Sequence, residues 1–245
     1  MIARVTKLRL SNLTDSSNDA LGPDGWTGRI AALIGIAPEG LAFTAIVAAA
    51  GLALYAVHYD ALAFLLIIAA IAIGAFFRDP DRIAEAPDSA VISGADGKVT
   101  EVIEAELPGG SGERFYRVSV FMSPLDVHVN RAPVGGKVLA VTHTAGEFRA
   151  AFRDEASEHN ERNLIVIEDT SGSRHAMMQV AGYLARRIVC HKRPGDALAR
   201  GQRIGMIMFG SRVDHFVPLS YRVTVMPGAR VRAGETVIAN LREMF

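Results

Sequence analysis

Two long apolar runs near the N-terminus constrain the fold of this chain more than any other feature of its sequence. Residues 41–57 and 61–77 contain no charged side chain, and only His58, Tyr59 and Asp60 separate them. Each run has about 17 residues, which is the lower limit for a helix that crosses a membrane. We therefore expect a two-helix membrane hairpin. The alternative, a helical hairpin inside a soluble domain, would need a large apolar sleeve from a small protein.

Basic residues flank the two runs and set the expected orientation of the hairpin. Arg29 precedes the first run, Arg78 and Arg82 follow the second, and the linker carries no Lys or Arg. Because positive charge is retained on the cytoplasmic side of a membrane, both ends of the hairpin should face the cytoplasm. We expect residues 29–82 to anchor the chain in the cell (inner) membrane, with the following domain on the cytoplasmic face.

The remaining composition excludes several classes of protein. The first 28 residues are polar and turn-rich and lack the apolar core of a signal peptide, so we expect residues 1–28 to be a poorly ordered extension. The formal net charge is zero, which gives no indication of nucleic-acid binding. Cys190 is the only cysteine, so an internal disulfide is impossible and a reducing compartment is expected.

Residues 83–245 have the pattern of a mainly β domain. Short apolar or alternating runs of about 4–8 residues, separated by Gly and Pro, are typical of strands. Such runs begin near residues 98, 115, 126, 137, 163, 175, 186, 203, 214 and 221. A modest helical candidate lies near residues 146–156. We expect a mainly β domain with a minor helical part.

Internal sequence similarity indicates a repeated turn–strand–turn unit in this domain. Two pairs of segments share a pattern: residues 194–205 with 227–238, and residues 95–102 with 135–141. Glycines at matching places suit turns that need a positive φ. Such units occur in the flattened, barrel-sandwich-like β scaffolds of biotinyl and lipoyl carrier domains. A carrier needs an exposed Lys on a hairpin tip, and the residues around Met206 and Met208 offer none, so the analogy concerns the fold alone.

The pair Gly210-Ser211 interrupts an apolar run and allows three interpretations. The simplest is a strand bulge, which glycine often marks. A second is a serine hydrolase, but its nucleophile elbow needs Gly at the places of Phe209 and Val213. A third is self-cleavage, in which the serine hydroxyl attacks the preceding carbonyl and forms an ester. Elimination of that ester and hydrolysis would leave a pyruvoyl group. Glycine suits the preceding position because it has no side chain to hinder the attack.

Five ordered segments decide between these interpretations, because they resemble the short, membrane-anchored form of the phosphatidylserine decarboxylases. The segments are SGADGKV (93–99), VFMSPLDVHVNRAPVGGKV (120–138), NERNLIVIED (160–169), QVAGYLARRIVC (179–190) and FGSRVDHFVP (209–218). FFRDPDR, after the second apolar run, is similar to the end of the anchor in that family. The resemblance covers roughly residues 36–240.

The resemblance implies a self-processed, pyruvoyl-dependent enzyme. Cleavage between Gly210 and Ser211 would give chains 1–210 and 211–245, which stay together as a heterodimer, and Ser211 would become the covalent pyruvoyl cofactor. The enzyme would convert phosphatidylserine to phosphatidylethanolamine and CO₂ without a metal. The family also acts on ether-linked archaetidylserine, and the sequence does not choose between the lipids. Whether the heterodimer dimerises further is left open.

The resemblance also assigns candidate catalytic residues. His128 matches the histidine of the central motif, and its pKa range suits proton transfer near neutrality. Asp96 matches the aspartate that orients a charge relay for cleavage, although an Asp-Gly pair also forms ordinary turns. The long bacterial forms have a second histidine where this chain has Arg131, so the base for self-cleavage is left open.

The phosphodiester of the substrate should meet a basic side chain, since Arg is shaped for bidentate phosphate binding. The candidate substrate-binding residues are Asn130, Arg131 and Arg212, with Arg186 and Arg187 as further candidates. Asp126, Glu161 and Asn163 are plausible pocket residues by motif.

Two other functions are compatible with parts of the sequence. One is a membrane-tethered β domain that never cleaves itself and acts as a binding module. The other is a serine hydrolase that uses an intact Ser211. All three hypotheses differ in the fate of the bond between residues 210 and 211.

Overall fold

The computed structural model describes residues 26–109, 112–146, 159–182, 187–208 and 211–242. The chain divides into two compact units, Met1–Pro80 and Asp81–Phe245. The predicted extension 1–28 and the helical candidate at 146–156 lie almost wholly outside the described residues. So does Gly210 of the predicted cleavage site.

The first unit contains three helices, α1 (Trp26–Ile34), α2 (Pro38–Ala56) and α3 (Asp60–Phe76). Pro38 occupies the first turn of α2, where its missing N–H costs no helical hydrogen bond. His58, with φ of 63°, lies in the turn that joins α2 to α3. Helices α2 and α3 thus coincide with the two apolar runs to within a few residues.

Small residues allow α2 and α3 to pack closely. A Cβ atom added at Gly51 would lie 3.0 Å from Ile67 Cδ1, so the glycine leaves room for this isoleucine. Ala63 and Ala70 are also buried on α3. The large apolar side chains instead point outward; Ile46 and Phe64 are each 68% exposed. Close contact through small residues is typical of helix pairs in membranes.

Only α2 is long and apolar enough to cross a membrane by the usual criterion of length and composition among the described residues. At 1.5 Å per residue its 19 residues span roughly 28 Å. The 17 residues of α3 form a shorter apolar helix.

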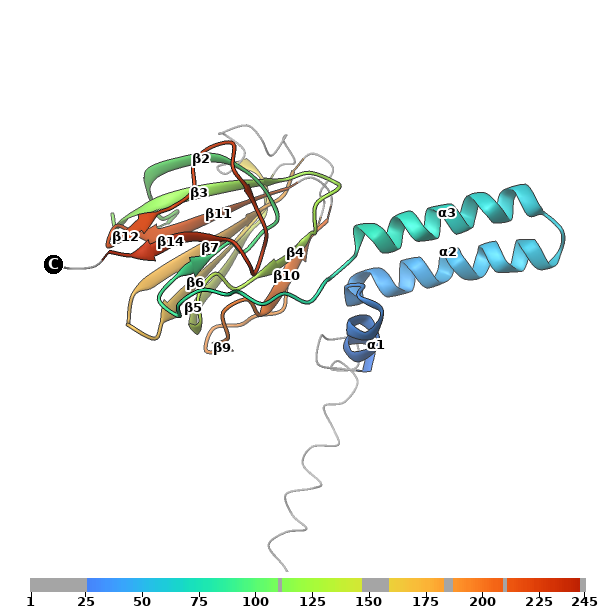
Figure 1. Ribbon diagram of the computed structural model, residues 1–245, viewed down its shortest axis with the longest axis horizontal. Helices are drawn as coiled ribbons and strands as arrows, with labels where there is room; N and C mark the ends of the chain where they lie inside the picture. Colours follow the sequence, from blue (N-terminus) through green and yellow to red (C-terminus); the bar gives the residue numbers. More distant parts are fainter. Residues whose placement is uncertain (1–25, 110–111, 147–158, 183–186, 209–210, 243–245) are drawn as a thin grey trace, which may run out of the picture. The chain divides into compact units, whose positions relative to one another are not determined.

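The second unit is built from antiparallel strands (Figure 1). They are β1 (Val91–Ile92), β2 (Gly97–Glu106), β3 (Arg114–Met122), β4 (Val129–Arg131), β5 (Gly136–Thr144), β6 (Arg162–Asp169), β7 (Arg174–Val180), β8 (Ile188–Cys190), β9 (Ala197–Leu198), β10 (Arg203–Ile207), β11 (Ser211–Pro218), β12 (Tyr221–Val223), β13 (Arg230–Val231) and β14 (Val237–Leu241). The prediction of a mainly β domain is confirmed.

A long curled sheet dominates this unit and places β11 near its middle. The strand order is β13-β2-β3-β11-β7-β6-β5-β9, with two three-stranded sheets, β4-β10-β8 and β1-β14-β12, beside it. Alternate residues of β11 point to opposite faces. Val213 and Val217 belong to the main core with Val120, whereas Phe216 packs with Phe115 in a smaller cluster.

The segments with matching sequence patterns fold into two copies of one structural unit. In each copy a longer strand (β2 or β5) pairs with a two-residue strand (β13 or β9). Val99 N donates to Ala229 O at 2.8 Å in the first copy, and Val138 N donates to Asp196 O at 2.9 Å in the second. The register of each longer strand shifts just after this valine. The repeated turn–strand–turn unit predicted from the sequence is therefore present.

Each copy begins with a glycine that touches the neighbouring strand. Gly97 has φ of 150°, and an added Cβ would lie 2.0 Å from Phe121 O. Gly136 has φ of 151°, and an added Cβ would lie 2.0 Å from Glu168 O. Only glycine fits both the backbone conformation and the space.

Alanine at either of these positions should therefore destabilise the β unit strongly and to a similar extent. Gly172→Ala is the matched control, because Gly172 also has a positive φ (82°) but has no atom within 4 Å of the added Cβ. The control should lose only the strain of the left-handed conformation, about 1–2 kcal/mol. Thermal midpoints followed by circular dichroism measure the difference. Equal shifts for Gly97→Ala, Gly136→Ala and Gly172→Ala would contradict the close approach of the strands.

Candidate functional site

Ser211 lies at the first position of β11 and is fully buried. Its strand is paired with β3 on one edge and β7 on the other (Figure 1). Ser211 is opposite Met122 on β3. The hydroxyl Oγ donates to Met122 Sδ at 3.4 Å. Because a thioether is a weak acceptor, this contact holds the hydroxyl only loosely. A hydroxyl in such a position can act as a nucleophile once a base removes its proton.

A short turn leads from Met122 to His128 and fixes the tautomer of this histidine. Asp126 Oδ2 accepts hydrogen bonds from the N–H (2.8 Å) and the hydroxyl (2.7 Å) of Ser123, which closes the turn. His128 is fully buried, and its Nδ1 lies 2.9 Å from Asp126 O. A carbonyl oxygen can only accept, so Nδ1 carries the proton and Nε2 carries the lone pair.

Asp96 precedes β2 at the same end of the sheet as Ser211. Strand β3 separates β2 from β11, which puts their backbones about 10 Å apart. Asp96 Oδ1 accepts from Arg82 Nη1 and from Ala233 N (2.7 Å), and Oδ2 accepts from Arg82 Nη2 at 2.9 Å. Among the described residues no hydrogen bond joins Asp96 to Ser211 or His128. Its role in orienting a relay therefore stays a prediction.

Asn130, in β4, contacts the same methionine as Ser211. Its Nδ2 lies 3.7 Å from Met122 Sδ, the same sulfur that accepts the Ser211 hydroxyl. Its Oδ1 accepts from Gln179 Nε2 at 2.9 Å. Asn163, another residue of the motifs, donates to Gln179 Oε1 at 2.9 Å. These polar side chains thus connect the neighbourhood of Ser211 to β6.

The two arginines predicted to bind substrate are both buried. Arg131 Nη1 donates to Gly201 O at 3.2 Å. Arg212 forms a two-point ion pair with Asp214, with Nε 2.9 Å from Oδ1 and Nη2 3.1 Å from Oδ2. Arg212 and Asp214 point to the face of β11 opposite to Ser211, because side chains alternate along a strand.

His215 is a buried histidine whose role the sequence did not indicate. It lies on the same face of β11 as Ser211, four residues further along. Its Nε2 accepts from Gly94 N at 2.7 Å, and its Nδ1 is 3.3 Å from Val118 O. Burial lowers the pKa of His215 from 6.5 to about 4, against a smaller opposing effect of the Val118 carbonyl. The imidazole is therefore neutral at physiological pH and holds the loop before Asp96 against β11.

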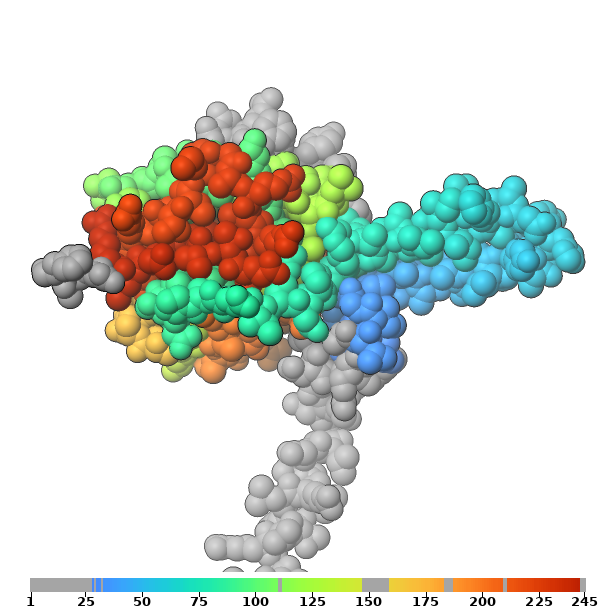
Figure 2. Space-filling model, in the orientation of Figure 1, coloured from blue at the N-terminus to red at the C-terminus, as the bar shows by residue number. Residues whose placement is uncertain are grey.

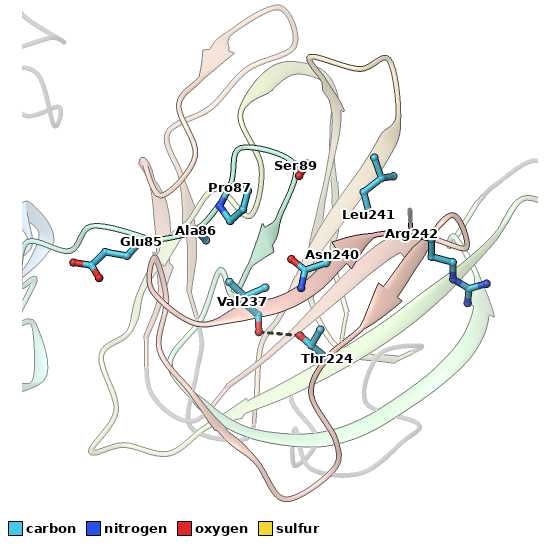
Figure 3. A pocket seen from close by; sticks show the side chains of 9 residues that line it. All are labelled: Glu85, Ala86, Pro87, Ser89, Thr224, Val237, Asn240, Leu241 and Arg242. Atoms are coloured by element: carbon cyan, nitrogen blue, oxygen red, sulfur yellow. Dashed lines mark hydrogen bonds between the residues drawn. The ribbon is translucent and has the colours of Figure 1, made fainter. Parts of the chain in front are cut away.

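Two pockets lie in the described part of the chain, and neither is lined by Ser211, His128 or Asp96. The larger, about 680 Å³, is lined by Glu85, Ala86, Pro87, Ser89, Thr224, Val237, Asn240, Leu241 and Arg242 (Figure 3). The smaller, about 270 Å³, includes Asp169, Arg200 and Tyr221. Leu241 lines both pockets and pairs with Tyr221, which follows the far end of β11. Neither pocket is the site around Ser211.

Comparison with known proteins identifies the family of this chain. A family profile described as phosphatidylserine decarboxylase matches residues 70–239. The chain belongs to the phosphatidylserine decarboxylase family. It is 42% identical over 207 residues to the phosphatidylserine decarboxylase proenzyme of Solidesulfovibrio magneticus, covering 84% of this chain and 96% of that protein.

Two further relatives carry the same name of phosphatidylserine decarboxylase proenzyme. The protein of Anaplasma phagocytophilum is 51% identical over 167 residues, which cover 68% of this chain and 74% of that protein. The protein of Erythrobacter litoralis is 39% identical over 238 residues, which cover 92% and 94%. The resemblance seen in the sequence motifs is confirmed, and the chain is an enzyme of the phosphatidylserine decarboxylase family.

The structure adds residues that the sequence did not single out. Gln179 begins one of the family motifs but has no titratable group, so it gave no chemical signal. Arg82 was assigned only to the flank of the hairpin, yet it holds the carboxylate of Asp96. The sequence motifs assigned no role to His215, which is buried against β11 and the loop before Asp96.

The neutral state of His215 should make the fold less stable below pH 6.5. As pH falls from 6.5, the unfolded chain takes up a proton at this histidine, whereas the folded chain does so only near pH 4. The free energy of unfolding should therefore fall across this window, by up to about 1.4 kcal/mol per pH unit. His215→Gln keeps a donor and an acceptor without titrating. In urea denaturation at about pH 6.5 and pH 5 this variant should lose less stability than the wild type; an equal loss would contradict the assignment.

Proposed function

We propose that this chain is a membrane-anchored decarboxylase that converts phosphatidylserine to phosphatidylethanolamine and CO₂ with a pyruvoyl group made from Ser211. The relatives named phosphatidylserine decarboxylase proenzyme support the substrate and a precursor state. The observation that carries the mechanism is the buried Ser211 at the head of the central strand β11. Archaetidylserine would suit the same site, because its reacting headgroup is identical.

The surroundings of Ser211 fit a pyruvoyl group. Conversion of the serine removes only a weak hydrogen bond to Met122 Sδ. The neighbouring Met122 and Val213 are fully buried, so water is kept from the group. Asn130 Nδ2, a donor, lies 3.7 Å from the same sulfur, and the new carbonyl oxygens need donors. The site thus offers an apolar wall and an amide donor.

Self-processing would follow from the Ser211 hydroxyl. Oγ attacks the carbonyl carbon of Gly210, the C–N bond breaks, and the proton of Oγ passes to the freed nitrogen. The resulting ester loses the Cα proton of residue 211 and expels the Gly210 carboxylate. Water then replaces the nitrogen, which leaves as ammonia. The products are chains 1–210 and 211–245.

His128 is the proposed acid of the decarboxylation. The pyruvoyl group supplies an electron-accepting carbonyl that takes up the electron pair left by CO₂. The Asp126 carbonyl holds the Nδ1 proton of His128, so Nε2 is the nitrogen that exchanges a proton with the substrate. To act as the acid, Nε2 must itself carry a proton, so the imidazole is positively charged at that step.

Asn130, Arg131 and Arg212 are the proposed contacts for the substrate headgroup. Both arginines are buried with internal partners, so a phosphate must displace one of these partners to bind. For Arg212 that partner is a carboxylate, and opening a buried ion pair leaves an uncompensated charge. Asn130 has no such competing charge.

The apolar helices are proposed to hold the enzyme at its substrate. The exposed large side chains of α2 and α3, such as Ile46 and Phe64, would be covered by lipid. By the positive-inside rule, the flanking Arg29, Arg78 and Arg82 would keep both ends of the hairpin at the cytoplasmic side of the inner membrane. The acyl chains of the substrate could then stay in the bilayer while the headgroup reacts.

The Ser211→Ala variant should remain a single chain without decarboxylase activity, because it lacks the attacking oxygen. The denaturing mass spectrum of the wild type should show chains 1–210 and 211–245, the second with a pyruvoyl group at its N-terminus. Ser119→Ala is the matched control: Ser119 is buried on the adjacent strand β3, and this variant should cleave and act normally. Decarboxylation of phosphatidylserine by Ser211→Ala would refute the pyruvoyl assignment.

His128→Gln should lose turnover by at least about 100-fold, the usual scale of acid–base catalysis, while the folded domain is retained. The measurement is CO₂ release from phosphatidylserine in detergent micelles. His175→Gln is the control, because His175 is a buried histidine that pairs with Asp169. It precedes Ala176, which is opposite Phe216 and so lies near the other end of β11 from Ser211. If both variants lose the same activity, His128 has no special role.

A further inference from the structure

Three basic and two apolar side chains form an exposed patch on the β unit. The apolar members, Leu125 and Met226, are 85% and 71% exposed. The basic members, Lys98, Arg230 and Arg232, are exposed as well. We call these five residues the basic–apolar patch. A single exposed leucine is ordinary on a protein surface, so the combination with charge is what sets this patch apart.

Contacts between three segments make the patch continuous. Arg230 on β13 is opposite Lys98 on β2. Arg230 Nη1 also donates to Asp126 Oδ1 at 2.9 Å, and Leu125 is the residue before Asp126. Met226 lies just before the turn that leads into β13. The patch therefore combines side chains from β2, from the turn after β3 and from the segment around β13.

The patch lies at the same end of the curled sheet as Ser211. Leu125 is in the connection from β3 to β4, which leads from Met122 to His128. The sulfur of Met122 accepts the Ser211 hydroxyl at 3.4 Å. Lys98 is the second residue of β2, and β2 begins at this end of the sheet. A surface that contacts the patch would therefore lie beside the candidate site.

The cations of the patch project further than the acids that pair with them. The side chain of Arg230 is 72% exposed, whereas that of its partner Asp126 is 12% exposed. The side chain of Arg232 is 73% exposed, and that of its partner Glu235, 3.6 Å away, is 35% exposed. The glutamates of β2 all lie beyond Lys98, toward the other end of the strand: Glu101, Glu104 and Glu106. The outermost layer of the patch is thus positive.

The duplicated unit shows that the fold does not require these cations. Both copies begin with Gly-Lys-Val and pair a long strand with a two-residue strand. Where the first copy has Arg230 and Arg232, the matching places of the second copy have Ala197 and Ala199. Because the two backbones fold alike, the positive charge beside Ser211 is a property of one surface and needs an explanation outside the fold.

We propose that the basic–apolar patch docks on the anionic surface of a lipid bilayer. Leu125 and Met226 enter the layer of headgroups, and the three cations around them are attracted to negatively charged lipids. The inference rests on the proposed function, in which the chain is anchored in a membrane and acts on an anionic lipid. Docking holds the Ser211 end of the sheet at the surface where the substrate headgroups lie.

Fluorescence tests the docking without requiring catalysis. Trp26 is the only tryptophan of the chain, so Trp26→Phe provides a dark background. Full-length chain with Leu125→Trp in that background is reconstituted into vesicles of phosphatidylglycerol and phosphatidylcholine with bromine on the upper acyl chains. Bromine should quench the emission of the new tryptophan. Salt at about 1 M, which shortens the Debye length to about 3 Å, should weaken the quenching.

Leu241→Trp in the same background is the matched control. Leu241 is also exposed, but it pairs with Tyr221, beyond the far end of β11 from Ser211. The emission of this variant should stay unquenched in the same vesicles.

Lys98→Gln tests the cations by their effect on membrane-bound substrate. With phosphatidylserine in phosphatidylcholine vesicles, this variant should act about fivefold more slowly, because one cation near the lipid surface is lost. With saturating dihexanoyl phosphatidylserine dissolved in water, it should act like the wild type. Lys137→Gln is the matched control, since Lys137 is exposed at the same place in the second copy, at the other end of the sheet. It should act like the wild type on both substrates.

These measurements distinguish the docking from the function on which it rests. A wild-type chain that decarboxylates neither substrate refutes the proposed function, and quenching can still be measured. If Leu125→Trp is quenched no more than Leu241→Trp, the docking is wrong. If Lys98→Gln acts on vesicles like Lys137→Gln, the role of the cations is wrong. Quenching confined to Leu125→Trp, with a loss in Lys98→Gln that is specific to vesicles, supports the docking.

Discussion

The candidate site depends on the pairing of β11 along both of its edges. Backbone hydrogen bonds to β3 and β7 fix the height of Ser211 relative to Met122 and the register of every residue that follows. Because side chains alternate, that register sends Ser211 and His215 to the inner face and Arg212 and Asp214 to the other. A slip of one residue would exchange the two sets and bury the ion pair in the main core. The pairing on both edges of β11 therefore holds Ser211 in the protein interior.

The interior around this strand contains polar groups that an apolar core normally excludes. Burying such groups is unfavourable unless each one is hydrogen-bonded or paired. His215 meets this condition by staying neutral between Gly94 and Val118, and Arg212 meets it through Asp214. The amides of Asn130 and Gln179 satisfy each other. These contacts also tie the loop that holds Asp96 to β11, so the groups that make the interior polar also make it rigid.

The sequence predicted the parts of the fold that local patterns control. Alternating apolar residues indicated β3 and most of β11, and matched glycines indicated the duplicated turns around β9 and β13. The two-residue strands β1, β9 and β13 are too short to leave a pattern of their own. The motifs also identified Ser211 and His128 as candidates, because those residue types have chemistry that can be recognised in isolation.

Contacts between distant segments could not be predicted in the same way. Asn130, Gln179 and Asn163 come from three separate motifs, and only the closure of β4 over β7 brings their amides together. Arg82 follows an apolar run, where a basic residue has an adequate explanation, yet it pairs with Asp96. In both cases the partner is set by tertiary packing, and one sequence carries no record of that.

The C-terminal segment contributes strands to two sheets, and its described residues, 211–242, cover much of one face of the β unit (Figure 2). Its strands pair with β2, β3, β7 and β1, all of which precede the proposed cut. An uncut chain forms these pairings within one molecule, whereas two separated pieces would have to meet in solution and reassemble four interfaces. After cleavage, the lifetime of the native protein would thus be set by the rate at which it unfolds, and not by an equilibrium between folded and unfolded chains. The precursor would be the only form able to fold efficiently, and a mature molecule that unfolded would not readily regain its native state.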